Sequence, residues 1–506
     1  MSDTILSLLS ARPAGPAIGA PGRPWLDTSG LLDLVGETRR QLASVGIGRG
    51  GRVAIVLPNG PEMAAAFVAV AASASAAPLN PAYRDEEFAF YLSDLQPKAL
   101  VVQAGANSPS RAVASRLGIP LIELSPEPVG PAGRFRLDTA ALPRAVPAAG
   151  GPAEPEDIAL VLHTSGTTAR PKIVPLSNLN LAASARHIGR TLALKPRDIC
   201  LNIMPLFHIH GLIGATLSSL AAGASVSCTA GFNAIRFLTQ AEEVRATWYS
   251  AVPTMHQAIL GRAEREKGRA RALKLRFIRS SSSSLPRQVM AALEEVFGCP
   301  VIESYGMTEA AHQMTSNPLP PASRKPGSVG PAAGPEVAIM DETGQLLPQG
   351  QSGEVVIRGA DVTTGYADNP EANAKSFTNG WFRTGDEGRL DAEGYLWLTG
   401  RIKEIINRAG EKISPLEVDA ILMDHPAVAQ VVTFALPNAL LGEEVAAAVV
   451  LREQFSVTEG ELREFCSTRL SAFKVPRKIL FIKEIPKGAT GKLQRIGLAR
   501  KLGLAG

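Results

Sequence analysis

The chain has 506 residues, of which 45% are hydrophobic and 20% charged, as is usual for a globular protein of several domains. Its formal net charge of +5 suits small anionic ligands, and the absence of a dense Lys/Arg block argues against nucleic-acid binding. The sequence begins with no recognisable secretory signal, and no two of its four cysteines are closely spaced. We therefore expect a cytoplasmic protein with no stable membrane insertion and no zinc motif, of undetermined oligomeric state.

Strand-like and helix-like runs alternate in the first part of the chain. Strands are predicted at residues 53–57 and 99–103, and helices at residues 61–74 and 85–94. This alternation predicts α/β layers with largely parallel sheets. Residues 125–156 are rich in Pro, Gly and Ala, and we expect them to form a surface connection.

A polar loop follows the apolar residues 158–162, which predict a buried strand. Residues 163–172 read His-Thr-Ser-Gly-Thr-Thr-Ala-Arg-Pro-Lys, and Ser177 can cap a helix that begins near residue 178. A loop of Gly, Ser and Thr can surround an anion with backbone N–H groups and hydroxyls, and Lys172 adds positive charge. The loop therefore predicts triphosphate binding, although it is not a Walker loop and a plain polar turn has a similar composition.

Two further clusters carry carboxylates. Residues 303–309, Glu-Ser-Tyr-Gly-Met-Thr-Glu, follow a predicted strand end, so Tyr305 is expected in an exposed turn where it can stack on a purine. Thr308 and Glu309 offer the oxygen ligands that Mg²⁺ prefers. Asp386 closes a Thr-Gly-Asp triplet, which by itself is commonly a turn.

The C-terminal part has its own pattern after a β-rich stretch at residues 327–400. Helices are predicted at residues 415–424 and 458–470, with two strands between them. This pattern predicts a compact α+β module, with the boundary near Lys403.

Five motifs, at residues 163–172, 303–309, 384–386, 400–415 and 486–492, resemble those of the adenylate-forming enzymes in the same order. That superfamily comprises acyl-CoA synthetases, luciferases and peptide-synthetase adenylation domains. Ala169, Ile173 and Ala409 stand where the family usually has glycine. The resemblance implies an α/β fold with a large N-terminal ATP- and acid-binding domain of several subdomains (residues 1–402) and a small, mobile, hinged lid (residues 403–506).

The resemblance also implies an activity and its residues. A carboxylic acid attacks ATP·Mg²⁺ to give an acyl-AMP and pyrophosphate, and CoA then forms the thioester while the lid turns about Lys403. The implied catalytic residues are Lys492, Thr308, Glu309 and Lys403, and the implied metal ligands are Thr168 and Glu309. The implied ATP and AMP contacts are Thr164, Ser165, Gly166, Thr167, Thr168, Lys172, Ser304, Tyr305, Gly306, Met307, Asp386 and Arg401.

Three polar segments, at residues 205–211, 280–284 and 310–317, resemble the acyl pocket of the family and so bear on which acid is bound. Residues 246–254, 305–320, 325–330 and 402–415 resemble the oxalate–CoA ligases. This resemblance implies that His210, Ser282 and His312 contact the distal carboxylate of oxalate. Histidines suit a small dianion, because each can donate a hydrogen bond and can become charged near neutral pH. In isolation each histidine could equally be a polar core or cap residue, and the serines a flexible loop.

Other readings of the same motifs stay open. Malonyl-CoA synthetases share much of this pattern, whereas 4-coumarate or medium-chain acyl ligases need a less polar pocket. An amino-acid adenylation domain would load a carrier protein, and no carrier domain follows Lys492. A non-catalytic relative is expected to lose Lys492 or Glu309, and both are present.

Overall fold

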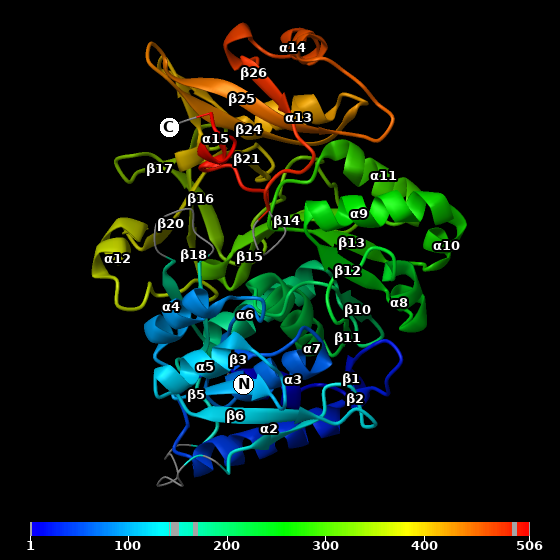
Figure 1. Ribbon diagram of the computed structural model, residues 1–506, viewed down its shortest axis with the longest axis vertical. Helices are drawn as coiled ribbons and strands as arrows, with labels where there is room; N and C mark the ends of the chain where they lie inside the picture. The colour runs from blue at the N-terminus through cyan, green and yellow to red at the C-terminus, as the bar shows by residue number, and fades with distance from the viewer. Residues whose placement is uncertain (1–2, 141, 143–150, 165–170, 488–492, 505–506) are drawn as a thin grey trace.

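The computed structural model describes residues 3–140, 142, 151–164, 171–487 and 493–504. It has a large N-terminal part and a smaller C-terminal part, the latter coloured orange to red at one end of the molecule (Figure 1). The mixed α/β class expected from the sequence is confirmed.

A seven-stranded sheet forms one layer of the large part, in the order β7-β6-β5-β3-β4-β8-β9. Its inner pairs are parallel, whereas the edge pairs β6–β7 and β8–β9 are antiparallel. The predicted surface connection is wrong in part, because β7 lies inside it and pairs with β6. The strands are β3 (Arg52–Val56), β4 (Ser75–Pro78), β5 (Ala99–Gln103), β6 (Leu121–Pro126), β7 (Phe135–Asp138), β8 (Ile158–His163) and β9 (Ile173–Ser177).

An eight-stranded sheet forms the second layer, in the order β15-β14-β13-β12-β10-β11-β1-β2. The central pairs are parallel, and the edge pair β14–β15 is an antiparallel hairpin. Its strands are β1 (Pro16–Gly19), β2 (Leu26–Asp27), β10 (Ile199–Asn202), β11 (Ser225–Cys228), β12 (Trp248–Ala251), β13 (Phe277–Ser280), β14 (Val301–Met307) and β15 (His312–Ser316).

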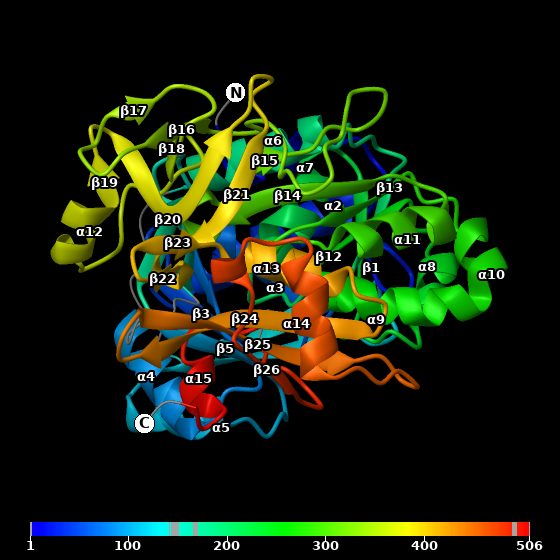
Figure 2. The same cartoon turned by 90° about the horizontal axis from the view of Figure 1, so that it is seen from above.

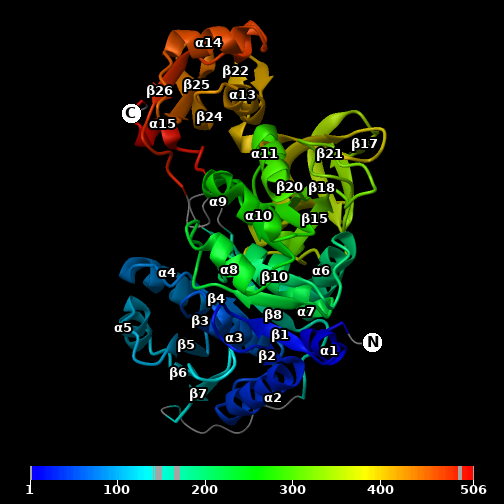
Figure 3. The ribbon, with the colours of Figure 1, turned by 90° about the vertical axis from the view of Figure 1, so that its right-hand side faces the viewer.

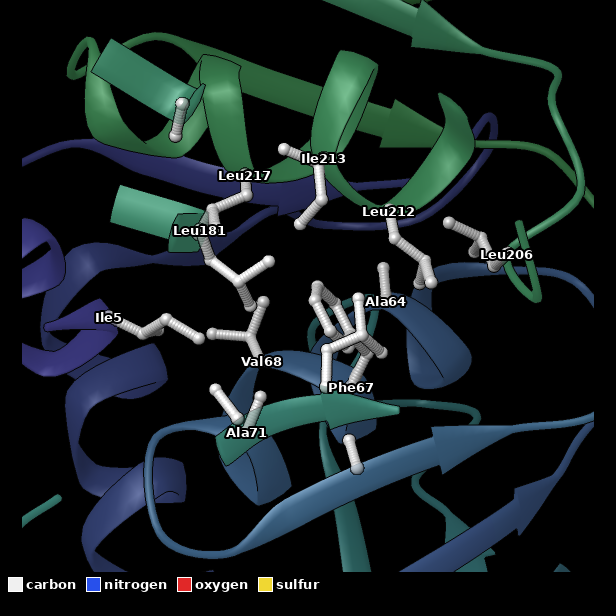
Figure 4. Close-up of a cluster of buried hydrophobic side chains, with 14 of the residues drawn as sticks. Ile5, Ala64, Phe67, Val68, Ala71, Leu181, Leu206, Leu212, Ile213 and Leu217 are labelled. Atoms are coloured by element: carbon white, nitrogen blue, oxygen red, sulfur yellow. The ribbon is translucent and has the colours of Figure 1, made fainter. Parts of the chain in front are cut away.

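Helices fill the space between the two sheets and cover their outer faces. The alanine-rich α3 (Pro61–Ala71), α6 (Asn178–Thr191) and the π-helix η1 (His210–Leu217) share one buried apolar cluster (Figure 4). Ser177 caps α6 as predicted, since its hydroxyl accepts a hydrogen bond from the Asn180 amide at 3.1 Å. The other helices are α1 (Ile5–Ser10), α2 (Thr28–Ser44), α4 (Asp85–Leu95), α5 (Pro109–Arg116), α7 (Ser218–Ala221), α8 (Phe237–Glu243), α9 (Pro253–Ala263), α10 (Lys267–Ala272), α11 (Arg287–Phe297) and α12 (Pro370–Ser376).

A third, antiparallel sheet follows in the order β17-β16-β18-β20-β19, with β21 paired to the other end of β20. Residues 327–400 therefore form the β-rich part that the sequence predicts. The strands are β16 (Glu336–Met340), β17 (Leu346–Leu347), β18 (Ser352–Arg358), β19 (Phe377–Thr378), β20 (Trp381–Leu390) and β21 (Leu396–Arg401).

The chain leaves this sheet after Arg401, makes the short 3₁₀ turn η4 (Ile402–Glu404) and enters a separate sheet at β22. Figure 2 shows β22 and β23 next to β20 and β21, and Figure 3 shows the C-terminal part beside α11 and β21. The parts are joined by hydrogen bonds from Gln288 to the Met423 carbonyl and from Ser414 to the Thr399 carbonyl. The C-terminal elements are β22 (Ile406–Arg408), β23 (Glu411–Ile413), α13 (Pro415–Met423), β24 (Val428–Asn438), β25 (Gly442–Leu451), α14 (Glu459–Ser467), β26 (Lys478–Phe481) and α15 (Leu498–Lys501).

The predicted ends of the individual helices and strands agree with the structure to within a few residues. Residues 99–103 are β5 as expected, whereas α3 ends at Ala71, three residues before the predicted end. All four cysteines are free and buried. Within the described ranges, no helix has the length and apolar character that a membrane span requires.

Candidate active site

The two ends of the loop predicted to bind phosphate are held together. Thr164 N donates to the Lys172 carbonyl at 2.9 Å, and Lys172 N donates to Thr164 Oγ1 at 3.1 Å. Before the loop, His163 Nε2 lies 3.0 Å from Asp94 Oδ2, and its ring packs edge-on against Tyr91. These contacts fix the start and the end of the loop on the β8–β9 hairpin. The predicted contacts Ser165, Gly166, Thr167 and Thr168 lie outside the described residues.

A buried carboxylate faces the end of this loop. Glu309 is 6% exposed, and its Oε1 accepts a hydrogen bond from the Tyr366 hydroxyl at 2.9 Å. Lys172 Nζ lies 4.3 Å from the centre of the Tyr366 ring. Burial raises the pKa of Glu309, while the Tyr366 hydrogen bond and the charges of Arg401 and Lys172 oppose that rise. Burial and the nearby Lys403 lower the pKa of Lys172.

The arrangement at Glu309 suits a divalent cation shared with phosphate. Among the described residues, no group of three or more His, Cys, Asp or Glu side chains could hold a metal ion. A buried carboxylate with one oxygen bound by a tyrosine is stabilised by a nearby cation, and Mg²⁺ commonly takes one or two carboxylates together with substrate phosphates. Glu309 therefore fits the implied Mg²⁺ as one protein ligand, with the remaining oxygens coming from other groups.

Asp386 of the third motif and Arg401 of the fourth motif lie on adjacent strands. The β20–β21 register places Asp386 opposite Arg401, whose Nε lies 3.5 Å from Asp386 Oδ1. The Tyr305 hydroxyl donates to Asp386 Oδ2. Burial and the Asp386 charge raise the pKa of Tyr305, so the phenol stays protonated and remains a donor. The three predicted nucleotide contacts Tyr305, Asp386 and Arg401 are thus brought together.

The predicted turn at Tyr305 is wrong. β14 runs from Val301 to Met307, so Tyr305 lies within a strand and is only partly exposed. The sequence misled because Glu303 and Ser304 are polar, although both are buried. Ser304 and Met307 pair with β15, and Thr308 and Glu309 form the 3₁₀ turn η3 (Thr308–Ala310) that joins the two strands.

The three predicted acid contacts converge. His210, at the start of η1, has Nδ1 3.1 Å from Ser282 Oγ and Nε2 2.6 Å from Ser250 Oγ. The rings of His210 and His312 have centroids 4.9 Å apart. His312 pairs with Met307 across the β14–β15 hairpin, so the hairpin that carries the nucleotide motif also carries the third acid contact. Both histidines are almost fully buried, at 2% and 1% exposure.

The backbone around these residues is tight. Ser282 and His312 have φ of +75° and +110°, in the region that side chains rarely adopt. A Cβ on Gly306 would lie 1.5 Å from the His312 carbonyl oxygen, so only glycine allows this approach of the two strands. Strain of this kind is typical of sites where the surrounding structure fixes a functional side chain.

The C-terminal module approaches the site through η4, which contains Lys403. Lys492 lies outside the described residues. Three residues after it, Arg495 is held by Glu404 of η4 at 3.1 Å and by Asp419 of α13 at 2.8 Å. The segment that follows Lys492 is therefore attached directly to the predicted hinge.

Comparison with known proteins gives a consistent result. The model of the AMP-binding enzyme family matches residues 19–367, and that of its C-terminal domain matches residues 417–492. This chain belongs to the AMP-binding enzyme family. It is 46% identical over 504 residues to the oxalate–CoA ligase of Arabidopsis thaliana, covering 98% of both chains. It is 44% identical to the oxalate–CoA ligase of Saccharomyces cerevisiae, covering 88% of this chain and 85% of the other.

A solved structure shows the same fold. ATP-bound MatB from Rhodopseudomonas palustris superposes with a TM-score of 0.89 and 29% identity, covering 100% of this chain and 99% of the other. The resemblance to adenylate-forming enzymes, with a large N-terminal and a small C-terminal domain, is thus confirmed.

Several contacts of the site were not predicted. Tyr366 and Asp94 carry no motif signal of their own, and only folding brings them to the site. Arg279 is different, because it directly follows the apolar pair Phe277 and Ile278, and a cation inside a buried strand is itself a signal. In the structure it is fully buried and contacts His312.

Proposed function

We propose that this chain is an ATP-dependent oxalate–CoA ligase that forms oxalyl-AMP and then oxalyl-CoA. The observation that carries the acid assignment is the convergence of His210, Ser282 and His312 beside the nucleotide motif. The 46% identity to an oxalate–CoA ligase over nearly the whole chain supports the same assignment. A buried wall of imidazole and hydroxyl groups favours a short dianion over an aliphatic or aromatic acid, which needs an apolar pocket.

In the first half-reaction, one carboxylate oxygen of oxalate attacks the α-phosphorus of ATP. The bond to the bridging oxygen breaks, and pyrophosphate leaves with its electron pair. The mixed anhydride oxalyl-AMP remains. His210, Ser282 and His312 hold the distal carboxylate, so the proximal one is directed at the phosphate.

The nucleotide is held by the remaining motifs. Asp386 accepts hydrogen bonds from the ribose hydroxyls, Arg401 neutralises charge beside it, and Tyr305 lies against the nucleoside. Thr164 to Thr168 and Lys172 bind the triphosphate, and Ser304, Gly306 and Met307 line the AMP site. Mg²⁺, held by Glu309 and Thr168 with Thr308 nearby, would neutralise phosphate charge. Lys492 stabilises charge that grows in the transition state.

In the second half-reaction, the CoA sulfur attacks the oxalyl carbon and AMP leaves as its phosphate takes the bonding electrons. The thiol proton passes to solvent. Residues 403–506 act as a lid that turns about Lys403. This rotation withdraws Lys492 and opens the path by which the CoA thiol reaches the acyl-AMP. The division after residue 402 is supported by the change of sheet between Arg401 and Ile406.

ATP, CoA and a small carboxylate are thus the proposed partners. A cytoplasmic location stays a prediction, and the four free, buried cysteines suit a reducing compartment.

Two measurements test the proposal. Oxalate-dependent exchange of pyrophosphate into ATP without CoA is expected, whereas AMP release should require CoA; exchange with amino acids instead would contradict it. His312→Ala should raise the KM for oxalate far more than the KM for ATP. An equal rise in both would overturn the assignment of His312 to the acid.

A further inference from the structure

A buried cation contacts one of the residues proposed to bind the acid. Arg279, in β13, is 0% exposed. The β12–β13 register places it beside Ser250, whose hydroxyl binds His210 at the start of η1. Gly214 of η1 leaves room for this cluster, because a Cβ there would lie 2.3 Å from His312 Nε2 and 3.2 Å from Arg279 Nη1.

The contacts of Arg279 are neutral groups. Its Nη1 lies 2.9 Å from His312 Nε2, and its Nη2 donates to Gln313 Oε1 at 3.0 Å. Within the described ranges it forms no ion pair, and its Nε has no hydrogen-bond partner. Burial lowers the pKa of Arg279 only to about 10, so the guanidinium is charged at neutral pH. A buried charge without a counter-charge is costly, and an anion bound nearby reduces that cost.

The guanidinium also determines which ring nitrogen of His312 carries the proton. Arginine has donors and no acceptor, so His312 Nε2 must accept, and the single proton of the neutral ring then lies on Nδ1. Among the described residues, the titratable groups near the pair include His210 of η1, whose ring centroid is 4.9 Å from that of His312, Cys200 of β10, which is within electrostatic reach of Arg279, and His256 of α9, which is hydrogen-bonded to the Arg279 backbone. A neutral thiol or imidazole supplies no negative charge. Burial indeed holds the pKa of the Cys200 thiol well above its usual range.

We propose that Arg279 is a positioning residue that sets the specificity of the pocket for dianionic acids. It holds His312 as a neutral donor through Nδ1 and provides the positive charge that balances the distal carboxylate. The inference rests on the proposed oxalate–CoA ligase function. A monocarboxylate presents no distal charge, so it gains nothing from the guanidinium.

Arg279→Met tests this in pyrophosphate exchange with oxalate and acetate. The variant removes the charge at similar length. A hydrogen-bonded charge of this kind is worth roughly ten- to hundredfold in affinity. The KM for oxalate should rise by about that factor, while the KM for ATP and the activity with acetate stay near the wild-type values.

Arg12→Met is the matched control. Arg12 is also a buried arginine whose pKa burial lowers to about 10, but it donates to the carbonyls of Leu220 and Ala224, away from the acid pocket. Arg12→Met is expected to lower thermal stability and to leave the oxalate-to-acetate ratio unchanged.

A pH profile separates positioning from simple structural loss. In Arg279→Met the Nε2 lone pair of His312 is open to a proton, and a protonated imidazole attracts a dianion. The variant should therefore recover part of its affinity for oxalate between pH 8 and pH 6, whereas the wild type should not. Arg279→Lys keeps the charge and should retain most of the preference.

If Arg279→Met does not fold, Gly214→Ala provides an independent test, since its Cβ would displace His312 from Arg279 while leaving the charge in place. A raised KM for oxalate is expected there as well. A wild type that does not prefer oxalate over acetate refutes the proposed function. A wild type that prefers oxalate, with variants at Arg279 and Gly214 that keep the full preference, refutes this inference alone.

Discussion

Glu303→Gln should remove a pH-dependent loss of stability from the N-terminal domain. Glu303 is 5% exposed in β14, and one of its oxygens accepts from Gly327 N at 3.0 Å. Burial raises its pKa from 4.5 to about 7, although the nearby Arg287 and Arg324 oppose the rise. The substituted amide would keep an acceptor for Gly327 without carrying a charge.

The size of the effect follows from linkage. Between pH 4.5 and about 7 the folded protein keeps a proton on Glu303 that the unfolded chain releases. The free energy of unfolding therefore falls as the pH rises through this window. Above pH about 7 the whole decrease is present. At roughly 1.4 kcal/mol per pH unit, this gives about 3 kcal/mol. The variant should gain that amount over the wild type between pH 4.5 and pH 8.

Urea unfolding of both proteins at several pH values measures this difference directly. Subtracting the wild-type value cancels the titration of all other groups. Glu295→Gln is the control: Glu295 is 72% exposed in an ion pair with Lys267, and exposed pairs are worth roughly 0–1 kcal/mol. A difference between Glu303→Gln and wild type that stays constant from pH 4.5 to pH 8 would refute the reasoning.

Three further predictions concern the site and the hinge. Tyr366→Phe removes a hydrogen bond to the ionised Glu309, so the pKa of Glu309 should rise. The acidic limb of the pH profile for adenylation should therefore move to higher pH, and an unmoved limb would count against the contact. Asp386→Asn should raise the KM for ATP by roughly ten- to hundredfold without raising that for oxalate, and a larger effect on oxalate would argue against a ribose contact. Arg495→Met leaves Glu404 and Asp419 without their partly buried partner and should destabilise the C-terminal module by roughly 1–3 kcal/mol in calorimetry. An unchanged transition would show that the ion pairs are not structural.

The order of elements was predictable because the local patterns are strong. The Ser177 cap, the apolar strand before it and the helix after it all lie where the sequence places them. The strand β7 was missed because its four residues, of which only alternate ones are buried, sit within a stretch rich in Pro and Gly. Tyr305 was misplaced because the polar residues before it conceal a strand that continues to Met307.

The candidate site was predictable only where motifs carry it. His210 and Ser282 are 72 residues apart in sequence, and their 3.1 Å contact depends on how η1 lies against β12 and β13. Family resemblance supplied these residues, since spacing alone could not. Arg279 belongs to no motif, and its role depends on a hairpin that folds His312 onto it.

The central claim is that a polar, positively charged pocket selects a dianionic acid for adenylation and transfer to CoA. AMP release with ATP, Mg²⁺ and CoA across oxalate, malonate, acetate, octanoate and 4-coumarate tests it most directly. The account predicts a strong preference for oxalate. Activity with monocarboxylates alone would contradict the assignment of His210, Ser282 and His312, while leaving the fold and the two-step chemistry in place.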